Sequence, residues 1–269
     1  MSDVKLFARN LTGASLRRKI SAGADAALLP VGSTELHGPQ LPLGTDSFIS
    51  EAVALLAARK SNATIFDPVN YSWSGMTRYS RPTISIPMEL ECNFVRAVVE
   101  ELRRCGFRKV ALIQFHGPGI ALTKLTREIF EETGFPVAFF GLMRMPSCGR
   151  ELCAARGVAW EASLAAAAAG LLGIEAEFDD ATEFADAPQF IGGAGRDKVI
   201  KAGGVTGALG SDDLHHGLFR EPVSVDTGRE ILQDMADAIA GALDGLGEFE
   251  AAWRNRNLLQ SWGSDEQKH

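Results

Sequence analysis

One loop-forming segment gathers side chains that bind metal ions. The stretch Gly32-Ser-Thr-Glu-Leu-His-Gly-Pro-Gln-Leu-Pro-Leu-Gly-Thr-Asp46 contains Glu35, His37 and Asp46 among prolines and glycines. Glu35 and His37 are two residues apart, so in extended backbone they share one face. Proline and glycine then turn the chain back and limit the entropy lost in ordering it, so we expect Asp46 to lie close by.

A second histidine joins this group from elsewhere in the chain. His116 directly follows Lys109–Phe115, an apolar run that predicts a buried strand. A lone histidine or carboxylate beside a strand end is more often structural, but four potential ligands together favour a metal site. Carboxylate oxygens mixed with imidazole nitrogens suit zinc, manganese or iron rather than calcium or a thiolate-bound metal.

The elements that must position these residues alternate along the chain. Ala26–Val31 and Pro136–Gly141 predict two further buried strands. Apolar periodicity and glycine punctuation predict helices at 47–60, with Asp46 and Ser47 as caps, and at 92–105, 120–132, 160–172 and 227–246. This order predicts an α/β fold with a mainly parallel sheet, in which ligands bind at the carboxyl ends of strands. His116 stands at such an end.

Bulk properties exclude several classes of function. The chain has 269 residues, 46% of them hydrophobic, and a formal charge of −7. A mildly acidic chain without basic blocks is a poor ligand for nucleic acid or an anionic membrane, which leaves a small-molecule substrate. It contains neither an apolar run of spanning length nor a secretion signal, so we expect a cytoplasmic protein. The four cysteines form no Cys-x-x-Cys pair and are interpreted as small packed side chains.

The segment 32–46 resembles the signature of the creatininase (creatinine amidohydrolase) family. Further similar elements follow in order: Tyr71-x-x-Ser74, Pro82-Thr-Ile-Ser-Ile86, Gly106-Phe-Arg-Lys-Val110 with His116-Gly117, Trp160-Glu-Ala-Ser163 and Gly204-Val-x-Gly207. The resemblance covers about residues 26 to 245. It implies a single creatininase-like domain over residues 1–262, with a flexible tail at 263–269.

The resemblance also implies a three-layer α/β/α fold and a binuclear metal centre. Asp46 would bridge both ions, Glu35 and His116 would complete one site, and His37 with Glu161 the other. Ser74 would contact substrate, and the chain would form a homo-oligomer, as the family's hexamers do. Two such ions can lower the pKa of a shared water and polarise a carbonyl, so a bridging hydroxide would attack an amide carbon. Because the histidines must be neutral to bind metal, activity should fall in acid.

Several departures from the family pattern concern proton transfer. Where the family has His-Ala-Gly-Glu, this chain has Arg156-Gly-Val-Ala159, so the usual histidine is absent. Thr77 replaces another family histidine, and Gly207-Ala-Leu209 replaces Gly-Asp-Pro. Losing a general base costs about 10²–10⁴ in rate if nothing replaces it. His215, from a glycine-rich segment expected to be a loop, is one replacement, with His216, Asp212 and Asp213 as alternatives; a solvated loop without catalytic duty is the other interpretation.

Other residues are candidates for contact with the substrate. Arg156 either pairs with a substrate carboxylate or forms an ordinary salt bridge. Trp73, Phe115 and Trp160 either line a flat apolar pocket or belong to the core. These changes argue against creatinine as the substrate and favour another cyclic amide, lactam, formamide or related carbonyl compound.

Three functions remain open from the sequence. The first is a metal-dependent amidohydrolase that cleaves a C–N bond of a small molecule, with peptide maturation as a narrower form. The second is a metal-dependent lyase or isomerase that acts through an enolate-like intermediate. The third is a catalytically inactive scaffold that kept its metal.

Overall fold

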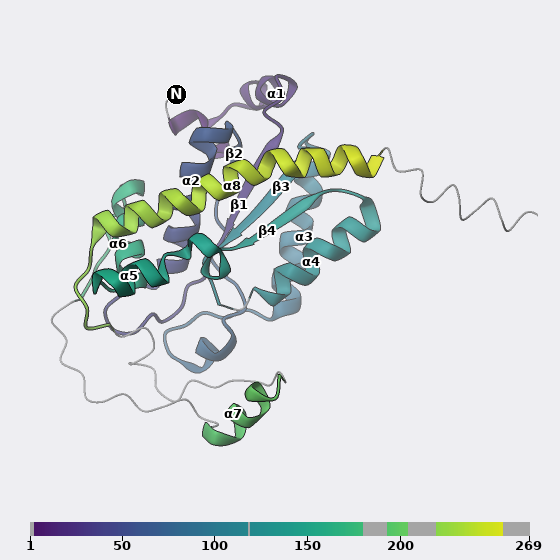
Figure 1. Cartoon of the computed structure of the whole chain (residues 1–269). Helices are drawn as coiled ribbons and strands as arrows, with labels where there is room; N and C mark the ends of the chain where they lie inside the picture. The colour runs from purple at the N-terminus through teal and green to yellow at the C-terminus, as the bar shows by residue number, and fades with distance from the viewer. Residues whose placement is uncertain (1–2, 118, 180–192, 204–218, 255–269) are drawn as a thin grey trace, which may run out of the picture.

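A computed structural model describes residues 3–117, 119–179, 193–203 and 219–254. Its centre is a sheet of parallel strands in the order β2-β1-β3-β4 (Figure 1). The strands are β1 (Ala26–Val31), β2 (Thr64–Ile65), β3 (Lys109–Gln114) and β4 (Val137–Gly141). The predicted α/β fold with a parallel sheet is confirmed.

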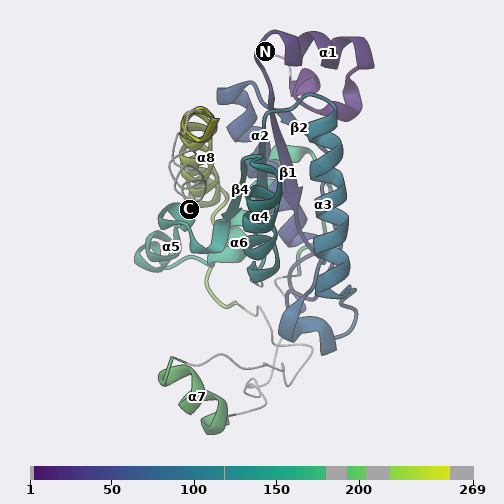
Figure 2. The ribbon, with the colours of Figure 1, turned by 90° about the vertical axis from the view of Figure 1, so that its right-hand side faces the viewer.

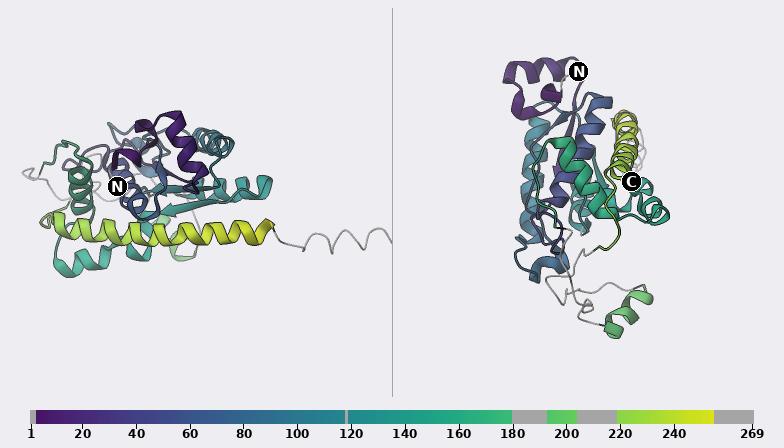
Figure 3. Two further views of the ribbon diagram at one scale, coloured as in Figure 1. Left: turned by 90° about the horizontal axis from the view of Figure 1, so that it is seen from above. Right: turned by 90° about the vertical axis from the view of Figure 1, so that its left-hand side faces the viewer.

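Helices cover both faces of the sheet, which makes three layers (Figures 2 and 3). One face carries α2 (Thr45–Ser61), α6 (Trp160–Leu172) and α8 (Val225–Arg254), whose apolar side chains share one buried cluster. The other face carries α3 (Met88–Arg104) and α4 (Ile120–Thr133), with α1 (Gly13–Ser21) packed beside them. Every residue of β1 is buried, as expected for a strand covered on both sides.

Short elements connect these layers. The 3₁₀ turns are η1 (Asp3–Lys5), η2 (Ala8–Asn10), η3 (Gly75–Tyr79), η4 (Leu142–Arg144) and η5 (Pro146–Cys148). Helix α5 (Arg150–Arg156) precedes α6, and α7 (Gly193–Lys201) lies apart from the sheet in Figures 1 and 2. Within the described residues, no helix is long and apolar enough to cross a membrane.

Small residues let α6 and α8 approach closely. A Cβ atom on Gly228 of α8 would lie 2.1 Å from the Ser163 carbonyl oxygen of α6, so only glycine fits this crossing. The alanine-rich run of α6 is buried against α2 and α8. The helix has the predicted bounds of 160–172.

The predicted caps of α2 are wrong, and two other predicted segments lie wholly or mostly outside the described residues. Asp46 and Ser47 do not cap α2, because the helix begins at Thr45 and follows Gly44, which provides no side-chain cap. The Asp46 carboxylate faces other side chains instead, and the Ser47 hydroxyl donates to the Ser33 carbonyl at 3.2 Å. The expected tail at 263–269 and nearly all of the expected glycine-rich loop at 203–217 lie outside the described residues.

Candidate metal centre

The close approach of β1 to the start of α2 brings the loop residues to the carboxyl ends of the central strands. In the parallel register, Val31 of β1 lies opposite Gln114 of β3, so both strands deliver their following residues to the same place. A Cβ atom on Gly32 would lie 2.4 Å from the Cα atom of Ser47 and 2.5 Å from its nitrogen. Glycine at position 32 therefore permits the contact that puts Asp46, in the first turn of α2, beside the strand ends.

Five side chains converge there in two sets that share Asp46. Glu35, Asp46 and His116 form one set, and His37, Asp46 and Glu161 form the other, with the ligand atoms of each set within 4.8 Å of one another. The Oδ2 atom of Asp46 lies 2.7 Å from His116 Nδ1. Its Oδ1 atom lies 3.2 Å from His37 Nε2. The two carboxylate oxygens thus face different imidazoles, the arrangement a bridging ligand needs.

The remaining two carboxylates complete these sets. Glu35 Oε1 lies 3.6 Å from His116 Nδ1 and 3.9 Å from His37 Nε2. Glu161 Oε1 lies 3.8 Å from His37 Nε2. The side chain of Glu161 is 24% exposed, whereas the side chains of the other four are 6% exposed or less, so solvent reaches the cluster beside Glu161.

Neighbouring groups restrain the orientation of three of the candidate ligands, Asp46, His37 and His116. The Ser33 hydroxyl donates to Asp46 Oδ2 at 2.7 Å. The ring Nδ1 of His37 lies 3.0 Å from the Glu35 carbonyl, and His116 Nε2 lies 3.1 Å from the Trp73 carbonyl. Each imidazole therefore donates its outer N–H to a backbone carbonyl and directs its other nitrogen toward Asp46, as ligands in metal sites do.

When no cation is bound, the electrostatics of the cluster favour protonated histidines. Burial disfavours a charged His37, but Asp46 outweighs it by charge and hydrogen bond and raises the pKa of His37 to about 10. For the same reasons the pKa of His116 is raised to about 9. Burial raises the pKa of Glu35 and that of Glu161. Burial would also raise the pKa of Asp46, but the two imidazoles lower it well below its usual value.

The donor set fits divalent cations. Each set offers one imidazole nitrogen and carboxylate oxygens at nearly dry positions, the chemistry that suits zinc, manganese or iron. In the metal-free cluster, the buried histidines lie between carboxylates and carry protons. These protons occupy the positions that bound cations would take.

The other predicted site residues are placed as follows. Arg156 donates to both carboxylate oxygens of Glu230 on α8, at 2.6 and 3.2 Å, so the salt-bridge interpretation holds. Phe115 is fully buried in the core, where its ring packs against Trp160 with centroids 5.2 Å apart. Within the described residues, neither Arg156 nor Phe115 makes a hydrogen bond or ion pair with the five candidate ligands, and their predicted roles toward substrate stay predictions. His215 and its neighbours at 212, 213 and 216 lie outside the described residues.

Trp160, Trp73 and Ser74 lie next to the cluster. Trp160 is half-buried, stacks beneath the Arg150 guanidinium at 3.7 Å and precedes Glu161. Trp73 contributes its backbone carbonyl to His116. The Ser74 hydroxyl is buried and makes no hydrogen bond of ordinary geometry among the described residues, although it lies close enough to Glu35 to lower the pKa of that carboxyl.

Two supporting residues were not found from the sequence. The Thr77 hydroxyl lies 3.0 Å from Glu35 Oε2 and 2.8 Å from the Ser74 carbonyl. Thr77 had been noted only as the replacement of a family histidine. Ser33 lies inside the signature segment, next to the candidates, and this proximity was the available signal.

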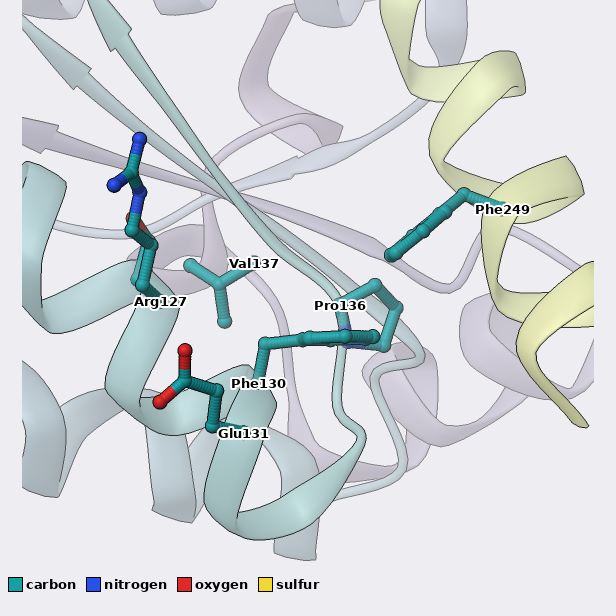
Figure 4. Close-up of a pocket in the computed structure, with 7 residues that line it drawn as sticks. Arg127, Phe130, Glu131, Pro136, Val137 and Phe249 are labelled. Atoms are coloured by element: carbon teal, nitrogen blue, oxygen red, sulfur yellow. The ribbon is translucent and has the colours of Figure 1, made fainter. Parts of the chain in front are cut away.

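A separate hollow of about 210 Å³ lies between α4, β4 and α8. Phe130, Val137 and Phe249 line it (Figure 4). Val137 is the first residue of β4, so the hollow opens at the amino end of that strand. The candidate ligands stand at the carboxyl ends of β1 and β3, so the hollow is not part of the metal centre.

Three hydrolases of known name match parts of this chain in sequence. A hydrolase of 3-dehydro-scyllo-inosose from Thermotoga maritima is 29% identical over 113 residues, which cover 42% of this chain and 36% of that protein. A mycofactocin precursor peptide peptidase from Mycolicibacterium smegmatis is 40% identical over 80 residues, covering 28% and 32%. Creatinine amidohydrolase from Pseudomonas putida is 26% identical over 116 residues, covering 41% and 45%. The matched segments thus span about a third of the length of the first two relatives.

Solved structures share the fold over nearly the whole chain. A manganese form of creatininase matches with a TM-score of 0.61 at 21% identity, covering 88% of this chain and 97% of the other. A creatininase variant of the Zn–Zn type matches with a TM-score of 0.60 at 21% identity, covering 88% and 96%. At this identity the likeness concerns the fold.

The family model of creatinine amidohydrolase matches residues 9–185, which include all five candidate ligands. Together with the shared fold and the signature loop at the sheet edge, this match shows that the chain belongs to the creatininase family.

Proposed function

We propose that this protein is a metal-dependent hydrolase that cleaves a C–N bond next to a carbonyl in a small molecule. The observation that carries the proposal is the position of Asp46, whose two oxygens face His116 and His37 on opposite sides of a buried cluster. One carboxylate shared by two complete ligand sets supports two divalent ions, zinc, manganese or iron, rather than a single structural ion.

Bound ions would supply a water of lowered pKa and would polarise the carbonyl under attack. The chain's own residues hold that arrangement rigid. Ser33 donates to Asp46 Oδ2 and the Thr77 hydroxyl lies within hydrogen-bond distance of Glu35 Oε2, which restrains the orientation of both carboxylates. Preorganised ligands reduce the reorganisation that the reaction would otherwise require.

Two residues at the cluster are suited to act on the substrate itself. Glu161 is the candidate ligand with the most exposed side chain, so its carboxylate is the one that solvent and substrate can reach. The Ser74 hydroxyl lies beside Glu35, makes no hydrogen bond of ordinary geometry among the described residues, and can hydrogen-bond a polar group of the substrate. Glu161 therefore stays our candidate for proton transfer in place of the family histidine that Arg156 replaces.

The proposed substrate class rests on the names of the relatives and on the departures of this chain from the family pattern. Two of the relatives described above are, by name, an amidohydrolase and a peptidase, which supports amide-type bonds. The absent proton-transfer histidine argues against creatinine and favours another cyclic amide, lactam or formamide. A homo-oligomer and a domain over residues 1–262 stay predictions of the family resemblance, and a cytoplasmic location stays a prediction of the sequence.

The test is turnover by the full chain loaded with Zn²⁺ or Mn²⁺ on a panel of lactams, cyclic amides, formamides and short peptides. We expect His37→Ala and Asp46→Asn to lose at least about 10³-fold in kcat/KM, because each removes a ligand needed for transition-state stabilisation. Asp67→Asn is the matched control, since the Asp67 side chain is 66% exposed and pairs with Arg9 at the surface.

Reaction in ¹⁸O-labelled water identifies the chemistry. A hydrolase places the label in the product acid, whereas a lyase or isomerase need not. Full activity in both His37→Ala and Asp46→Asn would refute the metal mechanism. A chain that binds metal but turns over nothing in the panel would favour the inactive scaffold.

A further inference from the structure

A buried carboxylate outside the ligand sets stands close to the metal centre. Glu91 lies in the first turn of α3 and is only 1% exposed. Its Oε2 atom accepts the backbone N–H of Trp73 at 3.0 Å. Its Oε1 atom makes no hydrogen bond of ordinary geometry among the described residues, although the Gln114 side chain lies close enough to the Glu91 carboxyl to lower its pKa against the larger raising effect of burial. One peptide N–H and one nearby amide are small compensation for removing a carboxylate from water, so packing alone does not account for an acid at this position.

The residue that Glu91 holds also holds a candidate metal ligand. The carbonyl of Trp73 accepts the Nε2–H of His116 at 3.1 Å. The opposite ring nitrogen, Nδ1, faces Asp46 at 2.7 Å and Glu35 at 3.6 Å. Trp73 is therefore fixed at both backbone groups, by a carboxylate of α3 on one side and by a ligand imidazole on the other.

Trp73 needs this support because it lies outside regular secondary structure. No helix or sheet ladder restrains its carbonyl. The flanking residues are held separately: the Ile86 N–H donates to the Ser72 carbonyl at 3.1 Å, and the Ser74 N–H donates to Ser85 Oγ at 3.0 Å. Loss of the Glu91 contact should therefore loosen the Trp73 carbonyl without unfolding the segment.

We propose that Glu91 is a positioning residue for the metal centre. By holding the Trp73 N–H, it directs the Trp73 carbonyl at His116, which keeps the ring proton on Nε2 and leaves Nδ1 to bind the ion. Glu91 acts through Trp73 and His116 and touches neither ion nor substrate. The inference rests on the metal-binding part of the proposed function and not on the reaction.

The first experiment measures Zn²⁺ affinity of the full chain by competition with a chromogenic chelator. Glu91→Leu removes the acceptor at similar volume and should weaken Zn²⁺ binding by about 10–100-fold, as loss of an outer-shell partner does. Glu91→Gln keeps an oxygen for the Trp73 N–H and should stay within about threefold of the natural chain. Glu89→Leu, at an exposed position of the same helical turn, is the matched control and should bind normally.

Two further measurements separate positioning from general destabilisation. In ¹⁵N-histidine spectra of the Zn²⁺-loaded protein, the natural chain and Glu91→Gln should show His116 protonated at Nε2, and Glu91→Leu should show a shifted or averaged signal. In a His116→Ala background, Glu91→Leu should weaken Zn²⁺ binding no further, because its effect passes through that ring.

A folded Glu91→Leu protein with normal Zn²⁺ affinity would overturn the inference, as would an equal loss of affinity in the His116→Ala background. If Glu91→Leu does not fold, Glu91→Asp withdraws the same oxygen by one methylene, and normal affinity in that variant would also overturn it. A chain that binds Zn²⁺ in a Glu91-dependent manner but hydrolyses nothing would refute the proposed function and leave this inference standing. If the natural chain does not bind Zn²⁺, both the proposed function and the positioning role of Glu91 are refuted.

Discussion

The charge arrangement of the cluster predicts that metal binding displaces protons. In the metal-free protein the pKa of His37 is about 10 and that of His116 is about 9. Both imidazoles are therefore protonated at pH 7, each between carboxylates. A cation at His37 Nε2 and a cation at His116 Nδ1 must each displace one proton from the ring that they bind, so filling both sites at pH 7 should release about two protons.

The magnitude follows from the same pKa values. Below the pKa of its histidine, each site should gain about tenfold in apparent affinity per pH unit, hence about a hundredfold between pH 6 and pH 8. The gain should stop near pH 9 at the site of His116 and near pH 10 at the site of His37. The elevated pKa values of Glu35 and Glu161 make binding weaker still in acid.

The stability of the metal-free chain should follow the opposite trend. A raised histidine pKa stabilises the folded state fully below the unfolded value of 6.5, and this contribution is lost as pH rises through about 9 to 10. Rising pH should therefore strengthen metal binding while it lowers the free energy of unfolding of the metal-free protein between pH 7 and pH 10.

Calorimetric titration with Zn²⁺ in buffers of different ionisation enthalpy counts the released protons, and chelator competition at several pH values gives the affinities. His37→Gln and His116→Gln should each release about one proton fewer than the natural chain. Equal affinities at pH 6 and pH 8, with no proton release, would refute the assignment of these imidazoles as buried, acid-paired ligands.

Two further predictions concern groups that support the ligands. Gly32→Ala places a Cβ atom within 2.5 Å of the start of α2, so we expect a loss of at least about 1–3 kcal/mol of stability in urea unfolding together with weaker Zn²⁺ binding. Gly13→Ala, whose Cβ would meet nothing within 4 Å, is the control, and equal unfolding curves for the two variants would contradict the argument. Thr77→Val removes the hydrogen bond to Glu35 and should weaken Zn²⁺ binding by about tenfold at nearly unchanged volume; unchanged affinity would show that Glu35 needs no such partner.

The parts of the site encoded locally could be predicted from the sequence. Glu35, His37 and Asp46 lie within a dozen residues, in a loop whose prolines and glycines restrict its course. The buried strands before this loop and before His116 are apolar runs, because a central parallel strand is covered on both faces. Such short-range features predict the strand positions, the end of the sheet at which the ligands gather and the kinds of metal-binding side chain. Glu161 was inferred from the family resemblance alone.

Tertiary structure decided where the remaining candidates lie and which residues they contact. Arg156 and Glu230 are 74 residues apart, and only the packing of α5 beside α8 places them within 2.6 Å, so the arginine was left open between two interpretations. Phe115 follows β3 directly, yet its side chain turns into the core that α2, α6 and α8 build. The direction of a side chain at a strand end depends on what is packed above it, and a local pattern does not contain that information.

The contact between Glu91 and Trp73 is the clearest case of this limit. An acid in the first turn of an amphipathic helix normally indicates solvent or a favourable interaction with the helix dipole. Here α3 buries it, because the helix packs over the segment that follows β2 and reaches the backbone beside His116. The chain alone thus determined the kinds of ligand and their shared edge of the sheet. Strand register and helix packing, which are set by contacts between distant residues, decided which atoms meet there and what holds them.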